Sequence, residues 1–151
     1  MPRISHNGDG PAHEVRVLVA TADRCLGAWA SDRLRAAGMN VCDEVAGSDD
    51  AVLRAGQLGP DVCLLDVALP GGAIAALRRM HDAAPATRVM MLARSADDPA
   101  LLPALRGGAS GCMVGTPEGL ALGRALADVL AGRTTLPRAL VTRLVTALGP
   151  A

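Results

Sequence analysis

Residues 60–72 read PDVCLLDVALPGG, and this stretch decides the fold. The residues from Val62 to Leu65 are apolar without interruption, and the run closes on the carboxylate of Asp66. An unbroken apolar run is typical of a strand that is buried on both faces, as the central strands of parallel sheets are. We therefore predict a central parallel strand over residues 62–66, with an acidic side chain at its carboxyl end.

Short β-branched runs alternate with longer Ala- and Leu-rich segments of helical period on both sides of this strand. The pattern predicts strands over residues 15–20, 41–45, 62–66, 88–92 and 110–114. It predicts the first helices over residues 26–37, 48–58 and 73–83. The second of these helices is expected to take its N-cap and its early negative charge from Ser48-Asp49-Asp50.

The helices in the last third of the chain are less regular. Pro103 lacks a backbone N–H, so a helix over residues 97–107 should start near Pro103 or be kinked there. Thr116-Pro117-Glu118 has the composition of a helix start, with Thr as N-cap and Pro in the first position, and this helix should run to about Ala131. Residues 136–148 repeat a helical apolar pattern and predict a last helix.

This alternation of strands and helices indicates an α/β fold with a parallel sheet that is covered by helices on both faces. Five such units fit a flavodoxin-like, doubly wound, five-stranded sheet of order 2-1-3-4-5. Binding sites in such sheets lie at the carboxyl ends of the strands, near the switch between strands 1 and 3. The candidate positions therefore follow Ala20, Leu65, Leu92 and Val114.

The composition excludes several classes of partner. Fifteen Arg and no Lys balance fifteen acidic residues, so no net charge draws the chain to nucleic acid or to an anionic membrane. No apolar run is long enough to suggest a membrane span, and residues 1–13 are expected to form a disordered polar tail rather than a signal peptide. Four widely spaced cysteines, at 25, 42, 63 and 112, are interpreted as core thiols of a cytoplasmic protein.

Three stretches, over residues 15–20, 60–72 and 104–111, resemble the receiver domains of two-component response regulators. The resemblance is strongest to the NarL/FixJ-like subfamily, whose output domain is a LuxR-type helix-turn-helix. It implies a CheY-like fold and places Asp66 at the phosphoacceptor position, followed four residues later by Pro and Gly. It also implies an acidic pair after strand 1 for Mg²⁺, a Thr or Ser after strand 4, and a Lys after strand 5.

This chain departs from that pattern at every supporting position, so the resemblance implies an atypical receiver with a degenerate pocket. The acidic pair aligns with Thr21 and Ala22, the hydroxyl position with Ala93, and the Lys position with Gly115. The polar groups that remain nearby, and that are possible contacts for an anion or ligand, are Asp23, Arg24, Arg94, Ser95 and Thr116.

Two interpretations of Asp66 stay open at this point. It caps the following loop or pairs with Arg24 or Arg94, or the same crevice retains an anion or small ligand clamped by these Arg residues. No cofactor is expected, and Mg²⁺ is not expected either, although Asp23 with Asp66 would be its ligands if it were retained.

The sequence predicts a regulatory and dimerisation module rather than an enzyme. A receiver-like domain over residues 14–132 would form a homodimer through helix 4, strand 5 and helix 5, and residues 133–151 would be a linker helix toward an output domain absent from this chain. DNA would be contacted only through that domain. A receiver that accepts phosphate at Asp66 from a histidine kinase, and a receiver that senses a small ligand, are the alternatives.

Overall fold

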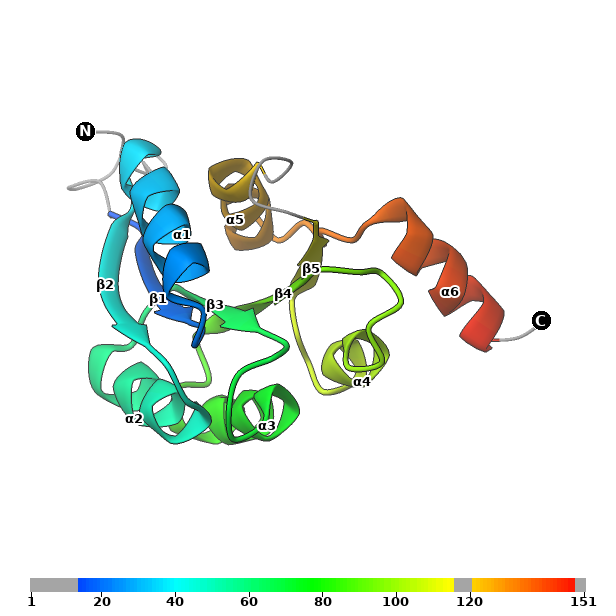
Figure 1. Ribbon diagram of the computed structural model, residues 1–151, viewed down its shortest axis with the longest axis horizontal. Helices are drawn as coiled ribbons and strands as arrows, with labels where there is room; N and C mark the ends of the chain where they lie inside the picture. Colours follow the sequence, from blue (N-terminus) through cyan, green and yellow to red (C-terminus); the bar gives the residue numbers. More distant parts are fainter. Residues whose placement is uncertain (1–13, 116–120, 149–151) are drawn as a thin grey trace.

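The computed structural model describes residues 14–115 and 121–148, and these form a parallel sheet covered on both faces (Figure 1). The strand order is β2-β1-β3-β4-β5, which confirms the predicted doubly wound topology. The strands are β1 Arg16–Ala20, β2 Asn40–Val45, β3 Val62–Asp66, β4 Arg88–Ala93 and β5 Gly111–Val114. All five residues of β3 are buried, as an unbroken apolar run at the centre of a sheet requires.

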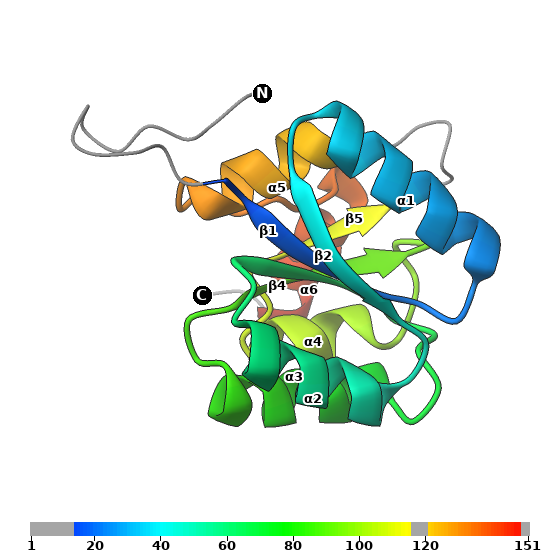
Figure 2. The same cartoon turned by 90° about the vertical axis from the view of Figure 1, so that its left-hand side faces the viewer.

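The helices divide between the two faces of this sheet (Figure 2). The helices are α1 Arg24–Ala36, α2 Ser48–Leu58, α3 Ala73–Ala83, α4 Leu101–Arg106, α5 Leu122–Leu130 and α6 Arg138–Leu148. Helices α1 and α5 lie against one face, and α2, α3 and α4 lie against the other. Each face has its own cluster of buried side chains, so the sheet separates two cores.

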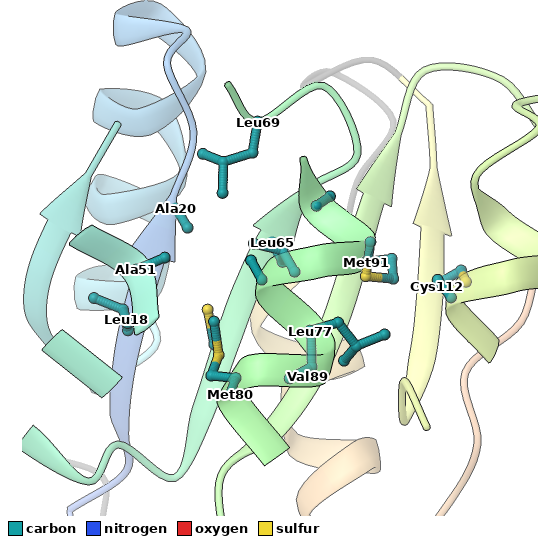
Figure 3. Close-up of a cluster of buried hydrophobic side chains, with 14 of the residues drawn as sticks. Leu18, Ala20, Ala51, Leu65, Leu69, Leu77, Met80, Val89, Met91 and Cys112 are labelled. Carbon is teal, nitrogen blue, oxygen red and sulfur yellow. The ribbon is translucent and has the colours of Figure 1, made fainter. Parts of the chain in front are cut away.

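The core over α2, α3 and α4 is built from short aliphatic and sulfur-containing side chains (Figure 3). Leu77 and Met80 of α3 point at the sheet, where Leu65 and Met91 lie on adjacent strands. The chain has no Phe or Tyr, so close packing depends on these aliphatic groups and on flexible Met side chains.

Several predicted boundaries and roles are corrected by the structure. Gly47, not Ser48, is the N-cap of α2, and Ser48 is a buried first-turn residue whose N–H donates to the carbonyl of Pro70 at 2.9 Å. Helix α4 begins at Leu101, so Pro103 lies in its first turn, where a missing N–H is tolerated.

The described part of α5 begins at Leu122. The predicted start at Thr116–Glu118 and the predicted tail over residues 1–13 lie outside the described residues.

The cysteines do not all belong to the core. Cys63 and Cys112 are buried and Cys42 is half-buried, but Cys25 is exposed at the start of α1, so its prediction as a core thiol was wrong. The two residues before it, Asp23 and Arg24, are polar, whereas Cys63 lies within the apolar run of β3.

The segment after α5 returns to the edge of the sheet. Thr135 forms an isolated parallel bridge with Gly111, and its carbonyl accepts a hydrogen bond from the N–H of Cys112 at 2.8 Å. Leu140 of α6 is fully buried in the core that contains α4. Arg143 of α6 donates to the carbonyl of Ala96, in the loop between β4 and α4. Helix α6 is therefore anchored to the domain near the loop that follows β4.

Within residues 14–115 and 121–148, no helix is long and apolar enough to cross a bilayer.

Two glycine substitutions should change stability in opposite directions. A Cβ at Gly111 would lie 2.7 Å from the carbonyl oxygen of Thr135, so Gly111→Ala should lower the free energy of unfolding. We expect a loss of about 1–3 kcal/mol, as for overpacked sites. A Cβ at Gly56, inside α2, would make an ordinary 3.6 Å contact with Ala83, so Gly56→Ala should raise the free energy of unfolding. That gain should be about 0.5–1 kcal/mol.

Urea unfolding followed by the fluorescence of Trp29 measures both changes. Hydrogen exchange at the N–H of Cys112 separates local undocking of Thr135 from global unfolding, because this N–H donates to Thr135. Unchanged stability and unchanged exchange in Gly111→Ala would contradict the described contact.

Candidate functional site

The carboxyl ends of the strands bring the predicted site residues to one edge of the sheet. Asp66 is the last residue of β3, Thr21 follows β1, Arg94 follows β4, and Gly115 follows β5. The N–H of Gly115 donates to the carbonyl of Ala93 at 3.1 Å, so the register of the sheet extends into these loops. Parallel pairing thus sets residues that are far apart in sequence around one carboxylate.

Asp66 is buried, with 3% of its side chain exposed. Its Oδ1 atom accepts from Nη1 of Arg94 at 2.9 Å and from the N–H of Ala68 at 2.9 Å. Its Oδ2 atom accepts from the hydroxyl of Thr21 at 2.7 Å. A buried carboxylate requires such compensation, because an ionised group without partners is strongly disfavoured away from water.

Arg94 also pairs with a second carboxylate. Its Nη2 atom lies 3.3 Å from Oδ2 of Asp23, while Oδ1 of Asp23 accepts from the N–H of Leu26 at 3.0 Å. Asp23 is thus both the N-cap of α1 and a partner of Arg94. The Leu26 hydrogen bond is the largest cause that lowers the pKa of Asp23, and the Arg94 charge lowers it further against an opposing effect of burial.

The other predicted residues do not converge on Asp66. Ala22 and Arg24 are exposed, and Arg24 lines a separate depression beside Glu44. Ser95 is exposed, and its hydroxyl accepts from the N–H of Asp97 at 3.1 Å. Thr116 lies outside the described residues.

Two positions leave space in place of a polar side chain. Ala93 carries only a methyl group, and Gly115 has a φ of 144°, a backbone conformation that favours glycine. A cavity of about 320 Å³ opens here. Its wall includes Leu26 and Trp29 of α1 and Leu92 of β4, and its rim includes Asp23 and Arg94.

Sequence reasoning missed the cavity residues of α1. Leu26 and Trp29 are three positions apart, so they share a helix face, and this spacing together with two small residues at the strand ends was the available signal. Among the residues that the structure describes, no group of three or more His, Cys, Asp or Glu side chains is arranged to hold a metal ion.

Residues 17–116 match the response regulator receiver domain family. The chain belongs to this family. The receiver domain is 37% identical over 99 residues to the DNA-binding transcriptional activator DevR/DosR of Mycobacterium tuberculosis. This match covers 65% of the present chain and 46% of that protein. It therefore spans less than half of the length of this curated relative.

Solved structures show the same fold. A LuxR-family response regulator from Aurantimonas sp. superimposes with a TM-score of 0.78 at 22% identity, covering 91% of this chain and all of that one. The receiver domain of the putative regulator NarL from Mycobacterium tuberculosis has a TM-score of 0.71 at 26% identity, covering 80% and 98%. The relatives of this receiver domain thus include regulators of the NarL/LuxR type.

A double-mutant cycle should show that Arg94 is coupled more strongly to Asp66 than to Asp23. Arg94→Met combined with Asp66→Asn should give a coupling of about 1–2 kcal/mol, since one partner is buried and the other is half-exposed. Arg94→Met with Asp23→Asn is the matched control, because Asn keeps the helix cap and removes only the charge. Urea unfolding of the variants measures both couplings, and equal values would contradict the described geometry.

Thiol reactivity should distinguish the four cysteines at pH 8. Burial raises the pKa of both Cys63 and Cys112 to about 12, so these thiols stay protonated and unreactive in the folded protein. Burial also raises the pKa of Cys42. Iodoacetamide should therefore modify exposed Cys25 first, as read by peptide mass, and Cys25→Ser should remove this fast phase. Fast labelling of Cys63 in the folded protein would contradict the packing.

Proposed function

We propose that this receiver domain acts as a regulatory module of a transcription regulator, and that it does so without the ordinary phosphorylation of Asp66. One observation carries the proposal: both carboxylate oxygens of Asp66 already accept hydrogen bonds, from Arg94, Ala68 and Thr21. An oxygen that accepts a charge-assisted bond from a guanidinium must give up part of that bond before it attacks phosphorus.

A second reason is that two positions of the pocket lack the groups that would support phosphoryl transfer. The transferred group needs a metal ion and fixed positive charge, because negative charge is spread over its oxygens in the transition state. Ala93 offers no hydroxyl, and a Lys in place of Gly115 would be strained at a φ of 144°. Asp23 is engaged as a helix cap and as a partner of Arg94, so a metal would compete with both contacts.

The loop after β4 connects the Asp66 site to the last helix of the domain. Arg94 contacts Asp66, and two residues later the carbonyl of Ala96 accepts from Arg143 of α6. A rearrangement of this loop would therefore change the docking of α6. We interpret residues 133–151 as a linker toward an output domain, because the relative DevR/DosR is a DNA-binding transcriptional activator and this chain matches only 46% of it.

The partners follow from the same interpretation. A homodimer would form through α4, β5 and α5, over residues 99–131, and α6 would add to this face, since the segment before it pairs with β5 through Thr135 and Gly111. Val141 and Val145 of α6 are 42% and 64% exposed and would add apolar area to it. A solved relative is described as RcsB dimers bound to DNA. Contact with DNA would be made by the output domain, in the cytoplasm.

Acetyl phosphate with Mg²⁺, followed by intact mass measurement, tests the proposal. We expect no phosphoryl adduct on this protein under conditions in which a conventional receiver, treated in parallel, is fully modified. The variant Arg94→Met is included because it frees Oδ1 of Asp66 from its guanidinium partner. Its failure to react would assign the block to the missing hydroxyl and amine rather than to Arg94.

The opposite outcome supports the alternative, a receiver that accepts phosphate at Asp66 from a histidine kinase. An adduct that forms on the unmodified sequence and is absent from Asp66→Ala would overturn the proposal. Sedimentation of the protein with and without acetyl phosphate then reports whether association depends on phosphate.

A further inference from the structure

The cavity beside the Asp66 network is a separate feature of the molecule. Its volume is about 320 Å³, at the lower end of the range for small-molecule sites, and Asp66 is not part of its lining. Two faces of the wall come from Leu26 and Trp29 on α1 and from Leu92 on β4. A bound molecule would therefore sit between the first helix and the sheet, above the loops that carry the site.

The wall of this cavity is largely apolar. Trp29 is the only Trp in a chain without Phe or Tyr, and it is half-buried at the cavity rather than enclosed in the core. An indole face beside aliphatic walls favours a flat ring, since stacking adds to the burial of apolar area. Ala93 carries only a methyl group and Gly115 has no side chain, which leaves room for such a ring.

The polar rim favours a cation or an N–H donor over an anion. Arg94 is already shared between the carboxylates of Asp66 and Asp23, so its positive charge is neutralised by residues of the chain itself. Asp23 and Arg94 of the rim carry opposite charges, and the buried carboxylate of Asp66, which is bonded to Arg94 outside the lining, adds one negative charge to this group of described residues. Asp23 is 48% exposed and faces the cavity mouth, and a carboxylate can accept more bonds than the two from Leu26 and Arg94.

We propose that this cavity binds a small aromatic amine, with its ring against Trp29 and its ammonium group at the carboxylate of Asp23. The ligand would contact Ala93 and Arg94, so it would act on the loop that also holds α6. Its role as the signal rests on the proposed function, because a phosphorylation-independent receiver needs another trigger that binds one conformation better. Binding itself does not depend on that function.

Three probes with one ring and different head groups test the proposal on the whole chain: phenethylamine, 2-phenylethanol and phenylacetate. Chemical shifts of the Trp29 indole N–H and of the backbone N–H groups of Ala93 and Gly115 report binding. Phenethylamine should give saturable shifts with a dissociation constant on the order of 1 mM, as expected for a fragment of this size. Phenylacetate should bind at least about fivefold more weakly, which corresponds to one partly exposed charge pair.

Cys25 lines the same cavity, so its alkylation by iodoacetamide is an independent measure. Phenethylamine at about its dissociation constant should slow this reaction about twofold, whereas phenylacetate at the same concentration should slow it by no more than about 1.2-fold. A slowed reaction without any shift at Trp29 would place the probe elsewhere and contradict the proposal.

Two variants of α1 separate the role of Asp23 from a general effect of charge. Asp23→Asn keeps the N-cap but removes the carboxylate, so phenethylamine, which should bind the unmodified protein more tightly than 2-phenylethanol, should lose this preference. Asp32→Asn removes an exposed carboxylate of the same helix, away from the cavity, and should leave the preference unchanged.

The proposal fails if no probe gives saturable shifts at tens of millimolar, or if phenylacetate binds more tightly than phenethylamine. The second result would mean that Arg94, rather than Asp23, determines which head group binds at the rim. These outcomes are distinct from failure of the proposed function, because phosphorylation of Asp66 and binding of phenethylamine are measured separately and either can occur without the other.

Discussion

The burial of one carboxylate at the end of β3 constrains the rest of the site. Asp66 is 3% exposed, and its charge is balanced by groups from three directions: Thr21 after β1, Ala68 in its own loop, and Arg94 after β4. Each of these contacts fixes the loop that supplies it. The carboxylate therefore holds the ends of three strands together, and the removal of any partner leaves a buried charge less compensated.

The choice of Arg rather than Lys as the counter-ion has further consequences. A guanidinium is planar and presents several donors, so Arg94 contacts Asp66 and Asp23 at the same time and links β4 to the cap of α1. The positive charge comes from the end of β4, whereas the residue that follows β5 is Gly115, with a φ of 144°. The cavity next to Trp29 occupies the space at this strand end.

The sequence predicted the fold and the central residue of the site, because both follow from hydrophobic period and strand order. It did not decide between Arg24 and Arg94 as the partner of Asp66, since both flank strand ends and only the position of the α1 turn separates them. Asp23 illustrates a second limit, because a carboxylate before a helix serves equally as a cap or as a metal ligand. Cys25 was misassigned for a related reason, as exposure of a first-turn residue depends on the packing of its helix.

The loop over residues 94–96 is where the site and the last helix meet. Arg94 at its start is held by two carboxylates, and the carbonyl of Ala96 is held by Arg143 of α6, so the loop has little freedom while both anchors persist. A trigger can change α6 only by binding differently to two arrangements of this loop. Phosphate on Asp66 would act by taking Arg94, and a ligand in the cavity would act by competing at Asp23 and pressing on Ala93. Under these proposals both triggers would therefore act through the guanidinium of Arg94, which pairs with Asp66 and with Asp23.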